Sequence, residues 1–276
     1  MGLRVNTNIS SLQGINSLNK VSRETSESSS KLSSGQRITK AADDAAGLAI
    51  SEKIKAEVRS SRQANRNAND GISLMQVAEG GLNESSGLLI RMKELAIQAA
   101  SDTVGDSERE KSNLEYEGLK AELERISRNT EFNGRKLLNG TGGRLDFQVG
   151  TGANSADDQV SYIPGAINSG TDSLGVSTLH VSSKTSAQDS ITKIEGAISK
   201  IASQRAVIGS LQNRLVASSN NLSVYTENMS EANSRIRDVD YASETANQAR
   251  FRILEDTNSA VLAQANLTGQ SALKLV

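Results

Sequence analysis

Two long runs of residues spaced alternately three and four positions apart constrain the fold of this chain more than any other feature. The first runs from Ala64 to Ala99 and the second from Ile191 to Val239. Such spacing places the residues along one side of an α-helix, where they can pack against another helix as a heptad seam. Each seam predicts a helix of about 50 residues, or about 75 Å at 1.5 Å per residue. The chain is therefore expected to be mainly α, with long antiparallel helices that form a rod.

The predicted seam positions are mostly small or aliphatic. The first seam comprises Ala64, Ala68, Gly71, Met75, Ala78, Leu82, Ser85, Leu89, Met92, Ala96 and Ala99. The second comprises Ile191, Ile194, Ile198, Ile201, Arg205 and Ile208, then, after one phase slip, Leu211, Leu215, Ser218, Leu222, Tyr225, Met229, Ala232, Ile236 and Val239. A shorter helix with Tyr116 and Leu123 on its apolar stripe is expected between the seams, and Ser107 and Glu110 have the spacing of a capping box at its start.

The segment 131–183 has a different character, because it is rich in Gly, Ser, Asp and Asn. Its stretch FNGRKLLNG contains two Asn-Gly pairs, which are strong turn signals. Leu145, Phe147 and Val149 alternate with polar residues as in a strand, and VSYI at 160–163 can pair with them. This segment predicts a small β-hairpin insert between the two long helices.

Both ends of the chain carry helical patterns that a single neighbour cannot satisfy. Near the N-terminus an apolar stripe steps by four and then repeatedly by three, so it moves around the helix. Its residues are Val5, Ile9, Leu12, Ile15, Leu18 and Val21. Near the C-terminus a narrow seam of mostly small residues includes Ile253, Ala260 and Leu267. Thin helices rich in Ser, Asn and Ala bury too little apolar area to offset their ordering, so both ends are expected to be disordered in the free monomer and to fold on assembly.

Composition argues against several classes of function. Lys plus Arg number 31 and Asp plus Glu number 32, so no nucleic acid or anionic membrane is expected as a partner. With no Cys, the chain has no disulfide, zinc–cysteine site or thiol nucleophile. No stretch approaches 18 apolar residues, so membrane insertion is not expected. The N-terminus lacks the pattern of a Sec signal peptide.

Candidate catalytic, metal and cofactor groups are few. Asp43 and Asp44 are adjacent, and successive side chains on a helix or strand point in different directions, so a helix start explains them better than a catalytic dyad. His180 is the only histidine, which argues against a catalytic triad or a multi-histidine metal site. Asp157 and Asp158 could approach Ca²⁺ together with Asn154, although a charged loop is the simpler interpretation. Gly150-Thr-Gly152 lacks the third glycine of a dinucleotide loop. No cofactor is expected.

Several segments resemble bacterial flagellin. In chain order they are VNTNISSLQ, LSSGQRITKAADDAAGLAISEKI, NDGISLMQVAEGGLNE, LLIRMKELAIQAA, TEFNGRKLLNG, SRIRDVDYASETAN and AVLAQAN. The resemblance covers residues 1 to about 150 and 190 to 276, and the short middle indicates a form without a large variable central domain. It implies a structural protein, not an enzyme, that is exported unfolded through the flagellar type III apparatus. Outside the cell it would polymerise into the filament used for swimming.

The resemblance also implies a division of the chain. Residues 1–42 would form an N-terminal polymerisation arm that pairs with a C-terminal arm, residues 240–276. Residues 43–130 would form the N-terminal rod helices and residues 184–239 the C-terminal rod helix. The short β and loop insert would occupy residues 131–183. The expected architecture is thus a long antiparallel helical rod with terminal coiled-coil arms.

Particular residues and partners follow from the same resemblance. Polymerisation would use the arm residues Val5, Ile9, Leu12, Ile15, Leu18, Val21, Ile253, Ala260 and Leu267. Asp43, Asp44 and Gly47 would form the junction between arm and rod. Arg91, Leu95 and Glu115 match a surface that is buried between subunits and sensed by an animal Toll-like receptor. Further expected partners are copies of the chain itself, an export chaperone, a cap protein and hook-associated proteins.

Three alternatives remain open from the sequence. A hook–filament junction protein has similar helical ends but forms only a ring or short adaptor. A soluble coiled-coil dimer would form a fixed small oligomer. An enzyme would use the carboxylates of Asp43 and Asp44 or of Asp157 and Asp158.

Overall fold

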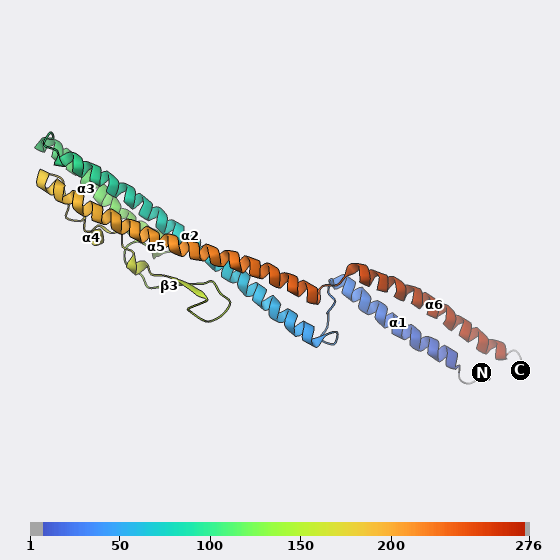
Figure 1. Cartoon of the computed structure of the whole chain (residues 1–276). Helices are drawn as coiled ribbons and strands as arrows, with labels where there is room; N and C mark the ends of the chain where they lie inside the picture. The colour runs from blue at the N-terminus through green and yellow to red at the C-terminus, as the bar shows by residue number, and fades with distance from the viewer. Residues whose placement is uncertain (1–7, 274–276) are drawn as a thin grey trace. The chain divides into compact units, whose positions relative to one another are not determined.

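The computed structural model describes residues 8–273, which are mainly helical (Figure 1). The helices are α1 (Ile9–Ser34), α2 (Ala45–Ala100), α3 (Asp106–Asn129), the short α4 (Thr171–Leu174), α5 (Lys184–Arg237) and α6 (Tyr241–Leu273). The chain divides into two compact units, with borders after Val58 and before Asn228. The middle unit contains most of α2 and α5, all of α3 and the β-hairpins, and the other unit contains α1, α6 and the segments that join them to α2 and α5.

The core of the middle unit forms where α2, α3 and α5 lie alongside one another (Figure 1). Every residue of the predicted first seam, from Ala64 to Ala99, is buried. Met75, Leu82, Leu89 and Met92 have no exposed surface at all. The 3–4 spacing therefore identified the inward face of α2 correctly from Ala64 to Ala99.

The predicted seam of α5 is wrong at two positions. Ser190 and Ala197 are buried, whereas the predicted Ile191 and Ile198 are only half-buried, and Gln204 and the predicted Arg205 are half-buried alike. With this change the inward positions continue in one heptad phase through Ile208 and Leu211, so the predicted phase slip disappears. Ile191 and Ile198, which led to the incorrect heptad assignment, still pack against the edge of the core.

Small residues allow the insert to approach the helices closely. A Cβ atom added to Gly71 would lie 3.1 Å from Leu215 Cδ1 and 3.1 Å from Phe147 Cδ1. A Cβ atom added to Gly81 would lie 2.6 Å from Leu138 Cδ1. Since such distances are shorter than a normal carbon–carbon contact, a larger side chain at Gly81 would displace the segment after the first hairpin.

Helix α3 begins two residues earlier than the predicted capping box implies. Gly105 precedes its first turn and supplies no side-chain cap, so the assignment of Ser107 as the cap is wrong. The preceding turn is held instead by Arg109, which is 8% exposed. Its guanidinium donates to the carbonyl oxygens of Ala99 at 2.8 Å and Ser101 at 2.9 Å. A cation thus satisfies carbonyl groups left free at the end of α2.

The insert contains two antiparallel hairpins, and the second of them is the predicted pairing of the strand at Leu145 with residues 160–163. Strands β1 (Glu131–Phe132) and β2 (Arg135–Lys136) are joined by Asn133 and Gly134, whose φ values of 49° and 75° fit a type I′ turn. Strands β3 (Leu145–Gln148) and β4 (Gln159–Tyr162) pair so that Phe147 faces Val160.

One side chain holds the insert together, and another ties it to α3. The Tyr162 hydroxyl donates to the carbonyl oxygen of Leu137 at 3.0 Å, and burial raises the pKa of this tyrosine to about 12. Glu124 of α3 accepts hydrogen bonds from the backbone N–H of Thr171 at 2.9 Å and from its hydroxyl at 2.8 Å. These bonds, the backbone one first, lower the pKa of Glu124.

The corrected seam of α5 predicts that replacing two isoleucines of this helix by alanine lowers the free energy of unfolding by different amounts. Replacing Ile194 by Ala should lower the free energy of unfolding by about 2 to 5 kcal/mol, because a fully buried side chain leaves a cavity. The matched change Ile191→Ala should cost about 1 kcal/mol or less, because Ile191 is half-buried. Urea unfolding followed by circular dichroism measures both. Equal losses would contradict the corrected phase.

The interaction of Glu124 with Thr171 predicts a pH-dependent contribution to stability. Because folding lowers the pKa of Glu124 below its ordinary value of 4.5, its stabilisation is present above that value and is lost as pH falls through the folded pKa. Glu124→Gln should therefore cost on the order of 1 kcal/mol at neutral pH and progressively less below about pH 4. Thermal melting of both proteins across this range tests it, and a difference independent of pH would refute the assignment.

Candidate assembly surface

Helices α1 and α6 form an antiparallel pair. Near one end Tyr241 donates its hydroxyl to the carbonyl oxygen of Leu32 at 2.9 Å. At the other end the Asn8 amide donates to the carbonyl oxygen of Ala265 at 2.9 Å. Between these points Gly14 faces Leu262, whose Cδ1 lies 3.1 Å from where a Cβ atom on Gly14 would be. The expected pairing of the two terminal helices is therefore present within one chain.

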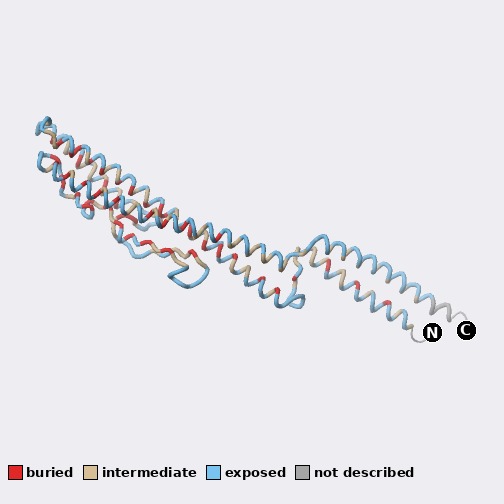
Figure 2. Tube along the Cα trace, in the orientation of Figure 1, coloured by how far each residue is buried: buried red, intermediate tan, exposed pale blue. Residues whose placement is uncertain are grey.

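Little apolar surface is buried inside this pair. The buried residues of α1 are Gly14, Val21 and Ser28. No residue of α6 from Tyr241 to Leu267 is buried, and Figure 2 shows that helix in the colours of exposed and intermediate residues. The hydroxyl oxygen of Ser28 has no hydrogen-bond partner although it is buried. The two helices thus bury few large apolar side chains against each other.

Large apolar side chains remain on the outside of the pair. Each is between 40% and 65% exposed, and they are Ile9, Leu12, Ile15, Ile253, Leu254, Val261 and Leu267. The predicted arm residue Ala260 is exposed as well, whereas Leu18 is half-buried and Val21 is buried. Val5 lies outside the described residues. The N-terminal stripe is therefore divided between an inward and an outward face, as its rotation around the helix implies.

Leu254 and Val261 belong to this surface but were not singled out from the sequence. They lie seven residues apart, and each directly follows a predicted arm position, Ile253 or Ala260. The outward face of α6 is therefore a double row of apolar residues with a heptad repeat. A search for a second seam beside the first would have found it.

Asp43 and Asp44 act on different parts of the backbone. The carboxylate of Asp43 accepts the N–H groups of Thr39 and Lys40, each at 2.9 Å. The N–H of Lys40 and then that of Thr39 lower the pKa of Asp43. Asp44 Oδ1 accepts the N–H of Gly47 at 2.8 Å, which makes it the N-cap of α2. The predicted cap is confirmed for Asp44, whereas Asp43 instead organises the segment before it.

Gly47 packs so closely against Asp44 and Ile38 that a side chain would not fit at this position. An added Cβ atom would lie 2.3 Å from Asp44 Oδ2 and 2.8 Å from Ile38 Cδ1. Asp44, Gly47 and Ile38 are thus in direct contact. The role of this cluster as a junction between arm and rod stays a prediction.

A second set of contacts joins the segments before α2 and after α5. The backbone N–H of Arg37 donates to the carbonyl oxygen of Arg237 at 2.7 Å, and that of Val239 donates to the carbonyl oxygen of Gly35 at 3.0 Å. The Arg237 guanidinium also donates to Gln36 Oε1 at 3.1 Å and forms an ion pair with Glu52 of α2. The hydrogen bond from Arg237 lowers the pKa of Glu52. Sequence analysis missed this set, because these polar residues follow no apolar pattern.

Arg91 and Glu115, two residues of the predicted recognition surface, are in contact. Arg91 Nε donates to Glu115 Oε1 at 2.9 Å, and Arg91 Nη1 donates to Glu94 Oε2 at 2.9 Å. These bonds, first the one that Arg91 donates to Glu94, raise the pKa of Arg91. Leu95 is only 2% exposed, so its side chain supports the surface from within.

Three exposed apolar residues lie near this ion pair along the sequence of α2 and α3. Ile90 and Ile97 lie one heptad apart on α2, and Leu114 precedes Glu115 on α3. Leu114 is 74% exposed. Sequence analysis did not name these residues, although Ile90 and Ile97 each follow a seam residue directly and could have been found from that repeat.

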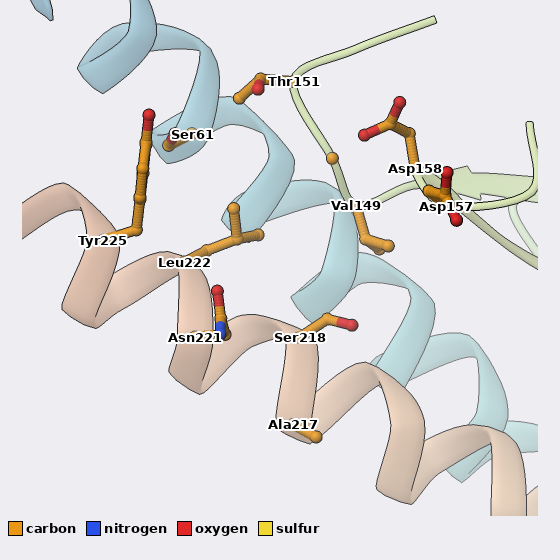
Figure 3. Close-up of a pocket in the computed structure, with 11 residues that line it drawn as sticks. Ser61, Val149, Thr151, Asp157, Asp158, Ala217, Ser218, Asn221, Leu222 and Tyr225 are labelled. Atoms are coloured by element: carbon orange, nitrogen blue, oxygen red, sulfur yellow. The ribbon is translucent and has the colours of Figure 1, made fainter. Parts of the chain in front are cut away.

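The remaining candidate groups have structural partners. Asp158 accepts the N–H of Asn154 at 3.0 Å, and Asp157 accepts from the Asn154 amide at 2.6 Å. Figure 3 shows both acids on the loop side of a cavity of about 550 Å³, across from Leu222 and Tyr225 of α5. His180 is exposed and its Nε2 lies 3.1 Å from Ser186 Oγ.

Residues 8–273 contain neither a cluster of metal-ligating side chains nor a membrane-spanning helix. No three His, Asp or Glu side chains come together there as a metal site. Likewise, none of the helices in that range combines the length and apolar character needed to cross a membrane.

Comparison with known proteins identifies the family. Residues 5–142 match the bacterial flagellin N-terminal helical region, and residues 191–276 match the bacterial flagellin C-terminal helical region. A flagellin of Halalkalibacterium halodurans is 42% identical, and the match covers 89% of each chain. Flagellin of Bacillus subtilis is 37% identical over 99% of this chain and 100% of that protein.

A solved structure agrees with these sequence matches. The crystal structure of Bacillus cereus flagellin is 34% identical with a TM-score of 0.51, over 57% of this chain and 88% of that one. The family sets aside an enzyme built on paired carboxylates, because flagellin is a structural protein. This chain therefore belongs to the bacterial flagellin family and is the filament subunit of the bacterial flagellum, located outside the cell.

Proposed function

We propose that assembly of this flagellin and folding of its terminal arms are one coupled step. The observation that carries the proposal is the distribution of apolar side chains in the α1–α6 pair. The large ones, such as Leu12 and Ile253, are exposed, and the interior contains mainly small and polar residues. A helix pair with so little interior burial gains little on folding alone.

Neighbouring copies supply the missing burial in this proposal. Ile9, Leu12 and Ile15 offer one apolar surface on α1, and Ile253, Ala260 and Leu267 offer another on α6. Burying such side chains contributes about 1.5 to 3 kcal/mol each. Because a filament repeats the same contacts at every subunit, the gain occurs only within the polymer. Val5, Leu18 and Val21 complete the proposed arm set.

The proposed arms are residues 1–42 and 240–276, with the rod in residues 43–130 and 184–239 and the insert in residues 131–183. Asp43, Asp44 and Gly47 form the proposed junction. Support comes from their hydrogen bonds, which set where α2 begins.

Exposed arm surfaces also suggest the other partners. A chain exported unfolded must not aggregate first, which supports an export chaperone that covers the arms. A cap protein would hold arriving copies while their arms fold, and hook-associated proteins would offer the first copy a matching surface. These three partners follow from the family resemblance and from the unsatisfied apolar face.

An animal Toll-like receptor is the last proposed partner, at the surface around Arg91 and Glu115. A fixed Arg–Glu pair with exposed Ile90, Ile97 and Leu114 nearby in the sequence offers an apolar contact area with a charged centre. Arginine and apolar anchors of this kind often dominate protein interfaces.

The coupling predicts that an exposed arm residue controls polymerisation. Ile253→Ser should weaken assembly by about 1 to 2 kcal/mol, because a side chain that is 65% exposed in the isolated chain loses its burial in the filament. The critical concentration for growth from seeds should rise about five- to thirtyfold. The conservative control Ile253→Leu should stay near the parent value. If both variants grew like the parent, the outward face of α6 would not be an assembly surface.

If the receptor binds the proposed recognition surface, removing the charge of Arg91 should weaken receptor signalling. Arg91→Ala should reduce receptor signalling by monomeric protein about tenfold or more. Arg125→Ala is the matched control, because Arg125 is an exposed arginine paired with Glu122 on its own helix. Reporter cells that carry the receptor measure both. Similar signalling from Arg91→Ala and the parent would exclude Arg91 from the contact.

A further inference from the structure

The interior of the α1–α6 pair specifies its register weakly. Among the buried residues of α1, only Val21 is large and apolar, and α6 contributes no buried residue from Tyr241 to Leu267. In a coiled coil, register is set by how well large core residues fit and by buried polar pairs. The side-chain hydrogen bonds along the pair are few and none is fully buried: Asn8 bonds to Ala265, Ser11 to Asn266 and Gln248 to Ser29. Some other contact must select one alignment.

A well-defined set of contacts lies where the two helices begin to pair. We call it the Arg237 clamp, and it consists of Gly35–Arg37, Glu52 and Arg237–Val239. Two backbone hydrogen bonds run in opposite directions between its strands, Arg37 to Arg237 at 2.7 Å and Val239 to Gly35 at 3.0 Å. Gln36 and Asp238 thereby form an antiparallel bridge. A bridge of this type permits only one alignment of the two backbones.

The Arg237 side chain ties this bridge to α2. It is 16% exposed, forms an ion pair with Glu52 and donates to Gln36 Oε1 at 3.1 Å. On the other strand, Arg37 Nη2 donates to the carbonyl oxygen of Ile236 at 2.7 Å. Close to the bridge in sequence, the Tyr241 hydroxyl at the start of α6 donates to the carbonyl oxygen of Leu32 near the end of α1. This bond fixes the same alignment at the first turn of the helix pair.

We propose that the Arg237 clamp sets the register of α1 against α6, with Arg237 as the positioning residue. The inference rests on the proposed function, because it concerns how the arms are presented for assembly. A slip of one heptad would shift the helices by about 10 Å and change which residues of α6 lie opposite Gly14 and its neighbours on α1. Residues 35–44, which join α1 to α2, are long enough to absorb that shift once the clamp opens.

The absence of Cys from the chain makes the register directly measurable. A Cβ atom on Gly14 would lie 3.7 Å from Leu262 Cβ, a distance well suited to a disulfide. The double variant Gly14→Cys with Leu262→Cys therefore reports the native register. Gly14→Cys with Glu255→Cys, or with Gly269→Cys, reports a slip of one heptad in either direction.

Each reporter is combined with three further changes. Arg237→Gln and Glu52→Gln each remove the ion pair of the clamp. Arg235→Gln is the matched control, because Arg235 pairs only with Glu231 on its own exposed helix face. The variants are grown into filaments from seeds with an excess of the cysteine-free chain, so growth does not depend on the modified copies. After oxidation and denaturation, mass spectrometry of single chains separates links within a copy from links between copies.

We expect the native-register link in the parent and in Arg235→Gln. In Arg237→Gln and Glu52→Gln it should be lost in part, with a matching gain in one of the slipped links. An unchanged native link in the clamp variants would overturn the inference. So would loss without any slipped link, because the clamp would then hold the arms folded rather than aligned, and so would an equal effect of Arg235→Gln.

The two proposals fail in different ways. Failure of coupled folding and assembly appears as an unchanged critical concentration for Ile253→Ser. Failure of the register inference appears as an unchanged pattern of links inside filaments that have already grown.

Discussion

The pairing of α1 with α6 cannot bury the large apolar residues that those helices carry, and the behaviour of the whole subunit depends on this shortfall. Inside the pair are Gly14, Val21 and Ser28, and outside are residues such as Leu12 and Ile253. An amphipathic helix normally turns its largest apolar residues toward its partner. Here they face away, so the chain contains surfaces that only other molecules can complete, as a filament subunit requires.

The middle unit shows the opposite balance. Met75, Leu82 and Leu89 of α2 and Ile194 and Ile201 of α5 have no exposed surface, and the hairpins cover part of the same core. Tyr162 and Glu124 fix the insert with hydrogen bonds to Leu137 and Thr171. This unit can therefore be stable in a single copy, while in our proposal the arms depend on neighbouring copies.

Apolar periodicity predicted the fold where one face of a helix dominates. It succeeded along α2 from Ala64 to Ala99, and it failed at Ser190 and Ala197, where small residues point inward and isoleucines line the edge. Polar contacts were harder to predict. Asp44 was found because N-caps have a local signature, whereas Arg237 and Glu52 lie 185 positions apart and share no pattern. The outward rows of the arms were predicted in part, because Leu254 and Val261 repeat beside the chosen seam.

Hydrogen exchange measured on dilute monomer and on filaments tests the central claim most directly. The account predicts that amides of α1 and α6 exchange rapidly in the monomer and become strongly protected in the filament. Amides at the core of α2, α3 and α5 should be protected in both. Equal protection of α1 and α6 in the monomer and the filament would contradict the claim that the arms depend on neighbouring copies.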